Sequence, residues 1–156
     1  MDVFYDTAVV AETNDVVRVM NYDMYYAGGR SGDFPGRPDC SGMGPTSTQP
    51  WAAMSMAWWA ERVPKSKLVM GLPAYSNDYS SKPGFGGGNG TQSPIGPPWS
   101  PESAPRNGKL ETVWDFFQQI YIHLYDRGDG TGPRIRYGTD VESTKAHLKT
   151  ATAQGI

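Results

Sequence analysis

The fold is decided by one stretch of the chain, Val16-Val17-Arg18-Val19-Met20-Asn21-Tyr22-Asp23. Its first five residues are rich in β-branched valine and nearly all apolar, which is typical of a parallel strand that is covered on both faces. Arg18 is the exception, so its charge must be paired or reach solvent. Because functional side chains lie at the carboxyl ends of parallel strands, Tyr22 and Asp23 stand where a cleft is expected.

Helices and strands alternate on either side of this strand. Residues 2–13 predict a short helix, and residues 21–49, rich in Gly, Pro and Ser, predict a long loop. A second helix is expected between Pro50, which suits a first turn, and Pro64, which stops it. Its apolar positions at helical spacing are Trp51, Met54, Ala57 and Trp58, widened by Met56 and Trp59. Residues 67–72 then predict a second apolar strand, and this order is typical of parallel α/β architecture.

The second half of the chain has weaker signals. Residues 73–107 are rich in Gly and Pro and predict one long loop. We expect a helix over residues 109–124, where apolar residues recur at helical spacing. A turn over 126–133, a short strand over 134–137 and a final helix over 140–153 complete the pattern.

The predicted strands are few for the helices around them. Two strands are well signalled, whereas a sheet needs about three or more to be stable alone. The sequence therefore favours part of a larger α/β sheet or barrel. The alternative is a small self-sufficient α/β domain with unusual loops.

Composition excludes several classes of function. The 156 residues include 14 Lys and Arg against 16 Asp and Glu, a formal charge of −2, which gives no clustered positive charge for nucleic acid. No apolar stretch approaches the roughly 20 residues that span a bilayer, and no basic region of a secretory signal is visible at the N-terminus. Cys40 is the only cysteine, so it forms no internal disulfide and does not indicate whether the protein works in an oxidising or a reducing compartment.

Turn formers and aromatic residues are both abundant. The chain has 19 Gly and 13 Pro beside 5 Trp, 9 Tyr and 5 Phe. This mixture favours short regular elements with aromatic loops that line a binding cleft, although the same aromatic residues can simply form core. Two interpretations are also open for Tyr22 and Asp23. They form a phenol and an acid at a cleft rim, or a packed tyrosine and a loop-capping aspartate.

Four segments carry a resemblance to a known family. They are Val19-Met20-Asn21-Tyr22-Asp23, Lys67-Leu68-Val69-Met70-Gly71-Leu72-Pro73-Ala74-Tyr75, Gly108-Lys109-Leu110-Glu111-Thr112-Val113-Trp114 and Arg136-Tyr137-Gly138-Thr139-Asp140-Val141-Glu142-Ser143. The first two resemble the Met-x-Tyr-Asp motif after barrel strand six and the Gly-Leu-Pro-x-Tyr ending of strand seven in family 18 glycoside hydrolases, the chitinase family. The last two resemble that family's helix-opening segment after strand seven and its Tyr-Asp-x-x-Ser run before strand eight.

The resemblance implies a partial (β/α)8 TIM-barrel-like α/β fold with parallel strands and long loops. Residues 1–156 would form a C-terminal segment, from about strand six to the threshold of strand eight, with a long insertion at about 76–138. The family's general acid lies in an Asp-x-x-Asp-x-Asp-x-Glu motif on strand four, which this chain lacks. The resemblance therefore implies that the acid and strands one to five belong upstream of residue 1.

The implied chemistry is substrate-assisted hydrolysis, in which the N-acetyl carbonyl oxygen of the substrate attacks the anomeric carbon. By the motif, Tyr22 would hydrogen-bond the N-acetyl group, and Asp23 would support the site and bind sugar. Met20 would line the pocket floor, and Tyr75 would face the same cleft. Aromatic platforms for sugar rings, for which a packing role is equally open, are Tyr25, Tyr26 and Trp99.

Three functions stay open. The first is a chitinase-like segment that acts on or binds β-1,4-linked N-acetylglucosamine polymers and is inactive alone without its acid. The second is a non-catalytic, lectin-like module that binds chitin or another glycan. The third is an assembly protein that self-associates through open sheet edges. The expected partner is a glycan with N-acetyl groups, not nucleic acid or a membrane. No cofactor or metal is expected, because His123 and His147 have no Cys or His at ligand spacing.

Overall fold

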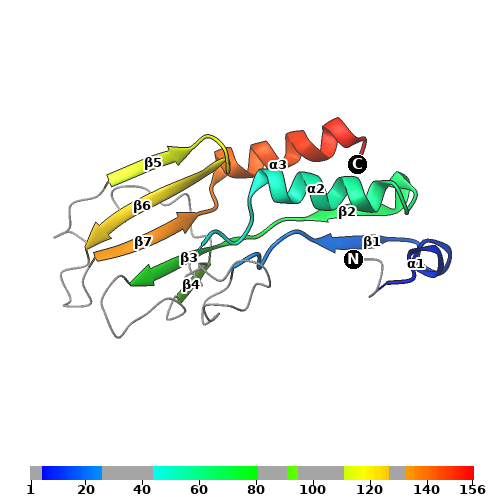
Figure 1. Ribbon diagram of the computed structural model, residues 1–156, viewed down its shortest axis with the longest axis horizontal. Coiled ribbons are helices and arrows are strands. Elements are labelled where there is room, and N and C mark those ends of the chain that lie inside the picture. The colour runs from blue at the N-terminus through cyan, green and yellow to red at the C-terminus, as the bar shows by residue number, and fades with distance from the viewer. Residues whose placement is uncertain (1–4, 26–43, 81–90, 95–110, 127–132) are drawn as a thin grey trace.

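A computed structural model describes residues 5–25, 44–80, 91–94, 111–126 and 133–156. The described elements form a parallel α/β half and an antiparallel sheet, which lie end to end along the long axis of the molecule (Figure 1). No helix in these ranges is both long and apolar enough to cross a bilayer.

The α/β half contains one strand–helix–strand unit. Its elements, in chain order, are α1 (Thr7–Thr13), β1 (Val17–Met20), α2 (Gln49–Ala60), the 3-10 turn η1 (Lys65–Lys67) and β2 (Leu68–Gly71). β1 and β2 pair in parallel, with Val17 opposite Leu68 and Met20 opposite Gly71. The two strands, the helix between them and their parallel pairing are thus confirmed. The expected coverage of the first strand on both faces is wrong, because Arg18 and Met20 are exposed while Val19 on the other face is buried.

Helix α2 is set by its cap, but its buried face differs from the expected one. Thr48 accepts a hydrogen bond from the backbone of Trp51, and Pro50 lies in the first turn. Met56 is fully buried with Val19 and Leu68, whereas Met54 is 70% exposed. The helical spacing predicted a buried face that includes Met54 and Ala57, and this is wrong for both, since both are exposed. The helix is apolar on nearly every side, so its spacing alone cannot select the face that meets the strands.

The antiparallel sheet corrects two expectations for the second half of the chain. Its strands are β3 (Tyr75–Ser80), β4 (Thr91–Pro94), β5 (Glu111–Asp115), β6 (Ile120–Asp126) and β7 (Pro133–Gly138), in the order β4-β3-β7-β6-β5. β3 and β4 lie inside the predicted long loop, and β5 and β6 replace the predicted helix over 109–124. The short strand expected over 134–137 is confirmed as β7. Residues 81–90 and 95–110 lie outside the described ranges.

The hairpin of β5 and β6 forms because local turn chemistry and strand propensity agree. The Asp115 carboxylate accepts hydrogen bonds from the backbone of Phe117 and Gln118, both at 2.9 Å. Gln119 has φ 57°, in the left-handed region that closes a tight turn. The flanking residues are rich in β-branched and aromatic types, which pack well on a pleated surface. The apolar residues of these two short strands happen to recur every three or four positions along the sequence, which is why the pattern predicted a helix.

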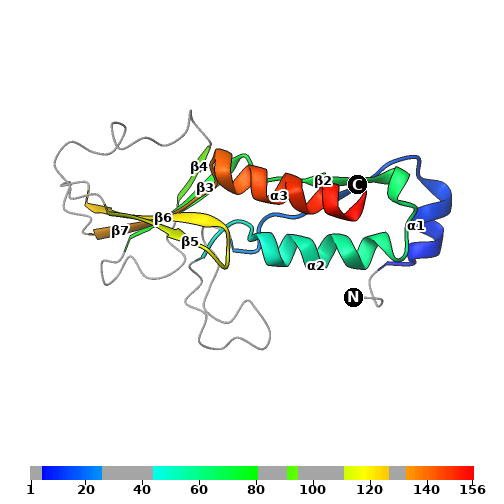
Figure 2. The ribbon, with the colours of Figure 1, turned by 90° about the horizontal axis from the view of Figure 1, so that it is seen from above.

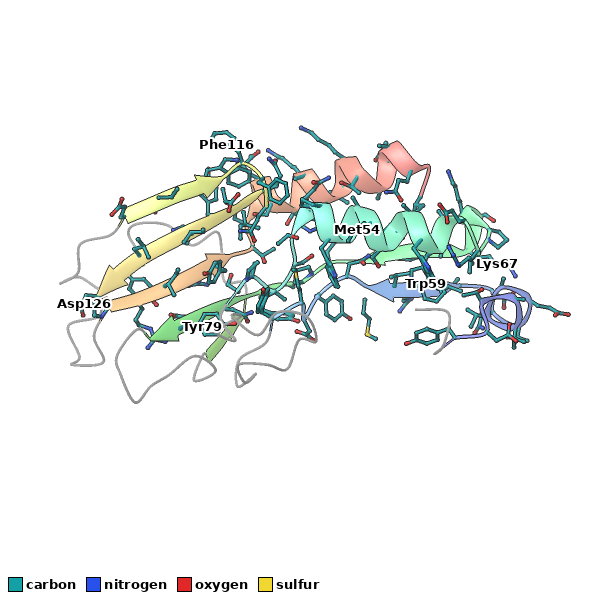
Figure 3. All side chains as sticks on the ribbon, viewed as in Figure 1. Met54, Trp59, Lys67, Tyr79, Phe116 and Asp126 are labelled. Atoms are coloured by element: carbon teal, nitrogen blue, oxygen red, sulfur yellow. The ribbon has the colours of Figure 1, made fainter. Side chains whose placement is uncertain are left out.

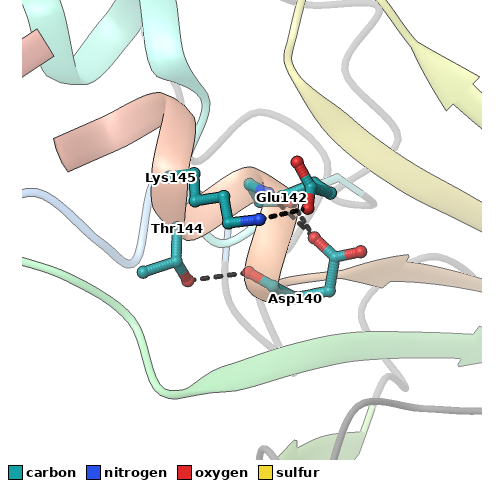
Figure 4. Close-up of polar contacts among 5 residues, drawn as sticks. Asp140, Glu142, Thr144 and Lys145 are labelled. Atoms are coloured by element: carbon teal, nitrogen blue, oxygen red, sulfur yellow. Dashed lines mark hydrogen bonds and ion pairs between the residues drawn. The ribbon is translucent and has the colours of Figure 1, made fainter. Parts of the chain in front are cut away.

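Helix α3 (Val141–Gln154) is confirmed, and Asp140 caps its N-terminus. The Asp140 side chain accepts a hydrogen bond from the Ser143 backbone at 2.8 Å, and its carbonyl accepts one from the Thr144 hydroxyl at 2.7 Å (Figure 4). Viewed from above, α3 lies beside α2 (Figure 2). The Ser47 hydroxyl joins the two helices through a 3.1 Å hydrogen bond to buried His147.

Candidate functional site

The carboxyl ends of β1 and β2 bring three of the predicted residues together. Tyr22 and Asp23 follow β1 after one intervening residue, and Tyr75 begins β3, just beyond β2. Since Met20 pairs with Gly71, both strands end at the same edge of the parallel sheet.

The side chains at this edge contact one another. The Tyr75 hydroxyl donates a hydrogen bond to the Asp23 carboxylate. The rings of Tyr22 and Tyr75 meet edge to face, with centroids 6.4 Å apart and planes at 74°. A Cβ on Gly71 would lie 3.1 Å from Cε1 of Tyr22, so the absence of a side chain at this position lets the ring approach β2. Two phenols and one carboxylate therefore form a single group, which we call the strand-end triad.

The electrostatics of the triad keep the Tyr75 hydroxyl protonated beside the Asp23 carboxyl group. Burial raises the pKa of Tyr75, and the hydrogen bond to Asp23 and its charge raise it further. Tyr75 therefore remains a protonated donor at neutral pH. Asp23 is exposed and has φ 60°, a left-handed conformation that aspartate tolerates better than most residues. The carboxylate is thus available to a ligand while its backbone is held in a defined turn.

The other predicted site residues are placed differently. Met20 is 69% exposed at the last position of β1. Tyr25 is buried, and its ring lies against Gly44, where a Cβ would overlap it. Tyr25 thus packs in the interior. Tyr26 and Trp99 lie outside the described residues.

Asn77 is a site-supporting residue that sequence reasoning missed. Its side-chain nitrogen donates to the carbonyls of Tyr25 at 2.8 Å and Gly44 at 3.1 Å. Tyr79 donates to the same Gly44 carbonyl at 3.2 Å, and burial raises the pKa of Tyr79 to about 12. These hydrogen bonds attach the backbone at Tyr25 and at Gly44 to strand β3. The alternation of Tyr75, Asn77 and Tyr79 was the available signal, since a strand places such residues on one face.

A polar interior lies behind the triad. The Asn21 side chain is fully buried, and neither of its polar atoms has a hydrogen-bond partner among the described residues. The buried Thr46 hydroxyl is also unpaired there, although its carbonyl accepts from the Met24 backbone at 2.9 Å. An unpaired buried group costs about 1–3 kcal/mol. A buried asparagine at position 21 therefore does not stabilise the fold through its packing.

The described residues offer no metal site, since no group of three or more His, Cys, Asp or Glu side chains converges among them. Both histidines make hydrogen bonds that suit structural roles. His147 donates from Nδ1 to the Ser143 carbonyl at 2.8 Å, and its Nε2 lies 3.1 Å from the Ser47 hydroxyl. His123 Nδ1 lies 3.0 Å from the Thr112 hydroxyl.

The fold of the chain is similar to those of several solved structures. A chitinase from Chromobacterium violaceum matches with a TM-score of 0.73 and 20% identity, over 97% of this chain and 41% of that one. The spore cortex-lytic enzyme SleL from Bacillus cereus matches with a TM-score of 0.74 and 19% identity, over 97% and 32% of the two chains. The chain has a chitinase-like fold.

A third structure with this chitinase-like fold is a chitinase-like agglutinin from Robinia pseudoacacia. It matches with a TM-score of 0.55 and 23% identity, over 99% of this chain and 44% of that one. The chain spans less than half the length of each of these three structures. The resemblance to family 18 glycoside hydrolases is confirmed at the level of the fold. No protein-family model matches the chain, and neither does any curated protein sequence.

Proposed function

We propose that the chain recognises β-1,4-linked N-acetylglucosamine polymers through the strand-end triad. The observation that carries the proposal is the hydrogen bond from Tyr75 to Asp23, which joins the ends of two neighbouring parallel strands. A sugar offers hydroxyl and acetamido groups that exchange hydrogen bonds with a carboxylate and a phenol. Its apolar C–H groups pack on the faces of aromatic rings. The triad supplies both kinds of surface.

The proposed framework is a segment of a (β/α)8 barrel. The parallel unit β1-α2-β2 has the order of two consecutive barrel strands with their connecting helix. Residues 76–138 are then an insertion between β2 and α3, and they include most of the antiparallel sheet. The packing of α3 beside α2 supports this assignment, because successive barrel helices are neighbours on the outer ring.

The roles of the triad follow from substrate-assisted chemistry. Tyr22 would donate a hydrogen bond to the N-acetyl group, and Asp23 would hold the sugar while Tyr75 fixes the carboxylate. The chain lacks the Asp-x-x-Asp-x-Asp-x-Glu motif that would protonate the leaving oxygen. We therefore expect glycan binding by this chain and no hydrolysis by it alone.

The second candidate function is that of a lectin-like module. The missing general acid favours it, because the retained triad then serves binding only. The fold shared with a chitinase-like agglutinin gives it further support. The two candidates differ in whether a longer protein supplies an acid, whereas the binding residues of this chain are the same in both.

Calorimetric titration of the chain with N-acetylchitooligosaccharides tests the proposal. The Asp23→Asn substitution removes the charge but keeps a residue that tolerates the left-handed backbone, and Tyr22→Phe removes only a hydroxyl. We expect each variant to bind at least about tenfold more weakly, the size of one charge-assisted hydrogen bond. The absence of binding by the unaltered chain at millimolar sugar would contradict the proposal. Turnover of a fluorogenic chitobioside by the unaltered chain would contradict the expected inactivity.

A further inference from the structure

Two phenylalanines are presented to solvent at the tip of the β5–β6 hairpin. Phe116 is 81% exposed and Phe117 is 79% exposed, more than any other large apolar side chain among the described residues. Figure 3 shows Phe116 at the hairpin tip, next to the start of α3. The Asp115 carboxylate holds the backbone of this tip through Phe117 and Gln118, so the rings project from a defined turn. Exposed aromatic rings on an ordered turn are typical of a binding surface.

The two rings line a groove of about 350 Å³ that reaches α3. Gln49 also lines this groove. It is held by a 3.1 Å hydrogen bond from its backbone nitrogen to the Gln118 carbonyl and a 2.8 Å hydrogen bond from its side-chain nitrogen to the Thr150 hydroxyl. The side-chain oxygens of Gln49 and Gln119 accept no hydrogen bond from the described residues. The groove therefore presents aromatic faces beside two unused amide acceptors.

A second groove, of about 460 Å³, continues along α3. The two share Lys149 and Ala153, and Leu148 and Lys145 line the extension. Lys149 makes no ion pair with any described residue, while Lys145 is paired with Glu142 at 2.7 Å. No carboxylate of the described residues lines either groove. We call this continuous surface the tip–helix groove; it includes none of Tyr22, Asp23 and Tyr75.

We infer that the tip–helix groove is a second glycan-binding surface, for a neutral N-acetylated polysaccharide strand. Sugar rings stack on Phe116 and Phe117, hydroxyl groups donate to the amide oxygens of Gln49 and Gln119, and the Lys149 ammonium donates to acetamido carbonyls. Flat aromatic faces beside amide oxygens and an ammonium group suit a polyhydroxylated chain, which offers both C–H surfaces and hydrogen-bonding groups. A purely apolar partner would leave the amide oxygens without hydrogen bonds. The inference rests on the proposed substrate class but not on the strand-end triad.

Partition of the full chain onto insoluble chitin, with soluble N-acetylchitohexaose titrated in parallel, tests the inference. The Phe116→Ala/Phe117→Ala variant should bind about tenfold more weakly, and Lys149→Gln about threefold more weakly. The Phe116→Tyr/Phe117→Tyr variant should bind like the unaltered chain, because the stacking faces remain. Met54→Ala is the matched control, since it removes an exposed apolar side chain from α2 outside the groove.

The same assay separates the two sites. Weaker binding of the alanine variant, combined with retained binding of Asp23→Asn, keeps the inference and overturns the strand-end proposal. Loss of binding only in Asp23→Asn keeps the strand-end proposal and overturns the inference. If the alanine variant alters only the sedimentation of the chain, or only its binding to phosphatidylcholine vesicles, the groove has another occupant and the inference is also overturned.

Discussion

The hydroxyl of Tyr75 donates a hydrogen bond to the carboxylate of Asp23, 52 residues away along the chain. The bond crosses from the end of one parallel strand to the residue that opens the antiparallel sheet. It therefore couples the candidate glycan site to the rest of the molecule. Burial and the charge of Asp23 both keep Tyr75 protonated, because both raise its pKa.

Removing this hydroxyl should weaken glycan binding without unfolding the chain. We expect Tyr75→Phe to bind N-acetylchitooligosaccharides about tenfold more weakly, because the Asp23 carboxylate loses the donor that orients it. Calorimetry measures the change, and a thermal melt checks the fold. Tyr5→Phe is the control, since Tyr5 is 55% exposed on the segment before α1. Equal affinities of Tyr75→Phe and the unaltered chain would show that the bond does not serve binding.

The antiparallel sheet should depend on one buried ion pair. Asp78 accepts a 2.9 Å hydrogen bond from Arg134 and another from the Tyr125 hydroxyl, and both charged side chains are more than nine-tenths buried. Asp78→Asn should lower the free energy of unfolding by about 3–5 kcal/mol, because it leaves a buried guanidinium uncompensated. Urea denaturation provides the measurement. In contrast, Glu142→Gln removes the exposed pair with Lys145 and should cost less than about 1 kcal/mol.

His123 should make the stability of the chain depend on pH. Burial, helped by the positive charge of Arg136, lowers the pKa of His123 from 6.5 to about 4. The unfolded chain therefore binds more protons between these values, and the free energy of unfolding falls as pH drops from about 6.5 to about 4, by on the order of 3 kcal/mol. The His123→Gln variant should lack this component in urea titrations at several pH values. Identical pH profiles would contradict the assignment.

Truncation of two methionines on α2 should change stability by very different amounts. Met56 is fully buried against Val19 and Leu68, so Met56→Ala should cost about 2–5 kcal/mol through lost burial and a cavity. Met54 is 70% exposed, and Met54→Ala should change stability by less than about 0.5 kcal/mol. Chemical denaturation of both variants checks the orientation of the helix. A larger loss for Met54→Ala would reverse the assigned faces.

Part of the candidate site was predictable because its signals are local. The apolar run ending at Met20 and the capped helix after Thr48 predict a parallel unit, and parallel strands carry function at their carboxyl ends. This placed Tyr22 and Asp23 correctly at the end of β1. Their partnership with Tyr75 came from the resemblance as a shared cleft, and the hydrogen bond itself became visible only in three dimensions.

The hairpin of β5 and β6 was not predictable from apolar spacing. Its residues were read as one helix because apolar side chains on two short strands recur every three or four positions. The deciding features are the Asp115 bonds across the turn and the positive φ of Gln119. The pairing of β6 with its other neighbour, β7, then stabilises the hairpin, and such pairing cannot be seen in a short stretch of sequence.

By itself, the sequence determined the elements whose information is contained in a few consecutive residues: strands β1, β2 and β7, helices α2 and α3, and the order that makes the first pair parallel. The tertiary structure alone decided which face of α2 is buried, that residues 111–126 pair as strands, and that Tyr75 meets Asp23. These outcomes depend on partners distant in the chain. Burial and cross-strand pairing override local preference wherever the two compete.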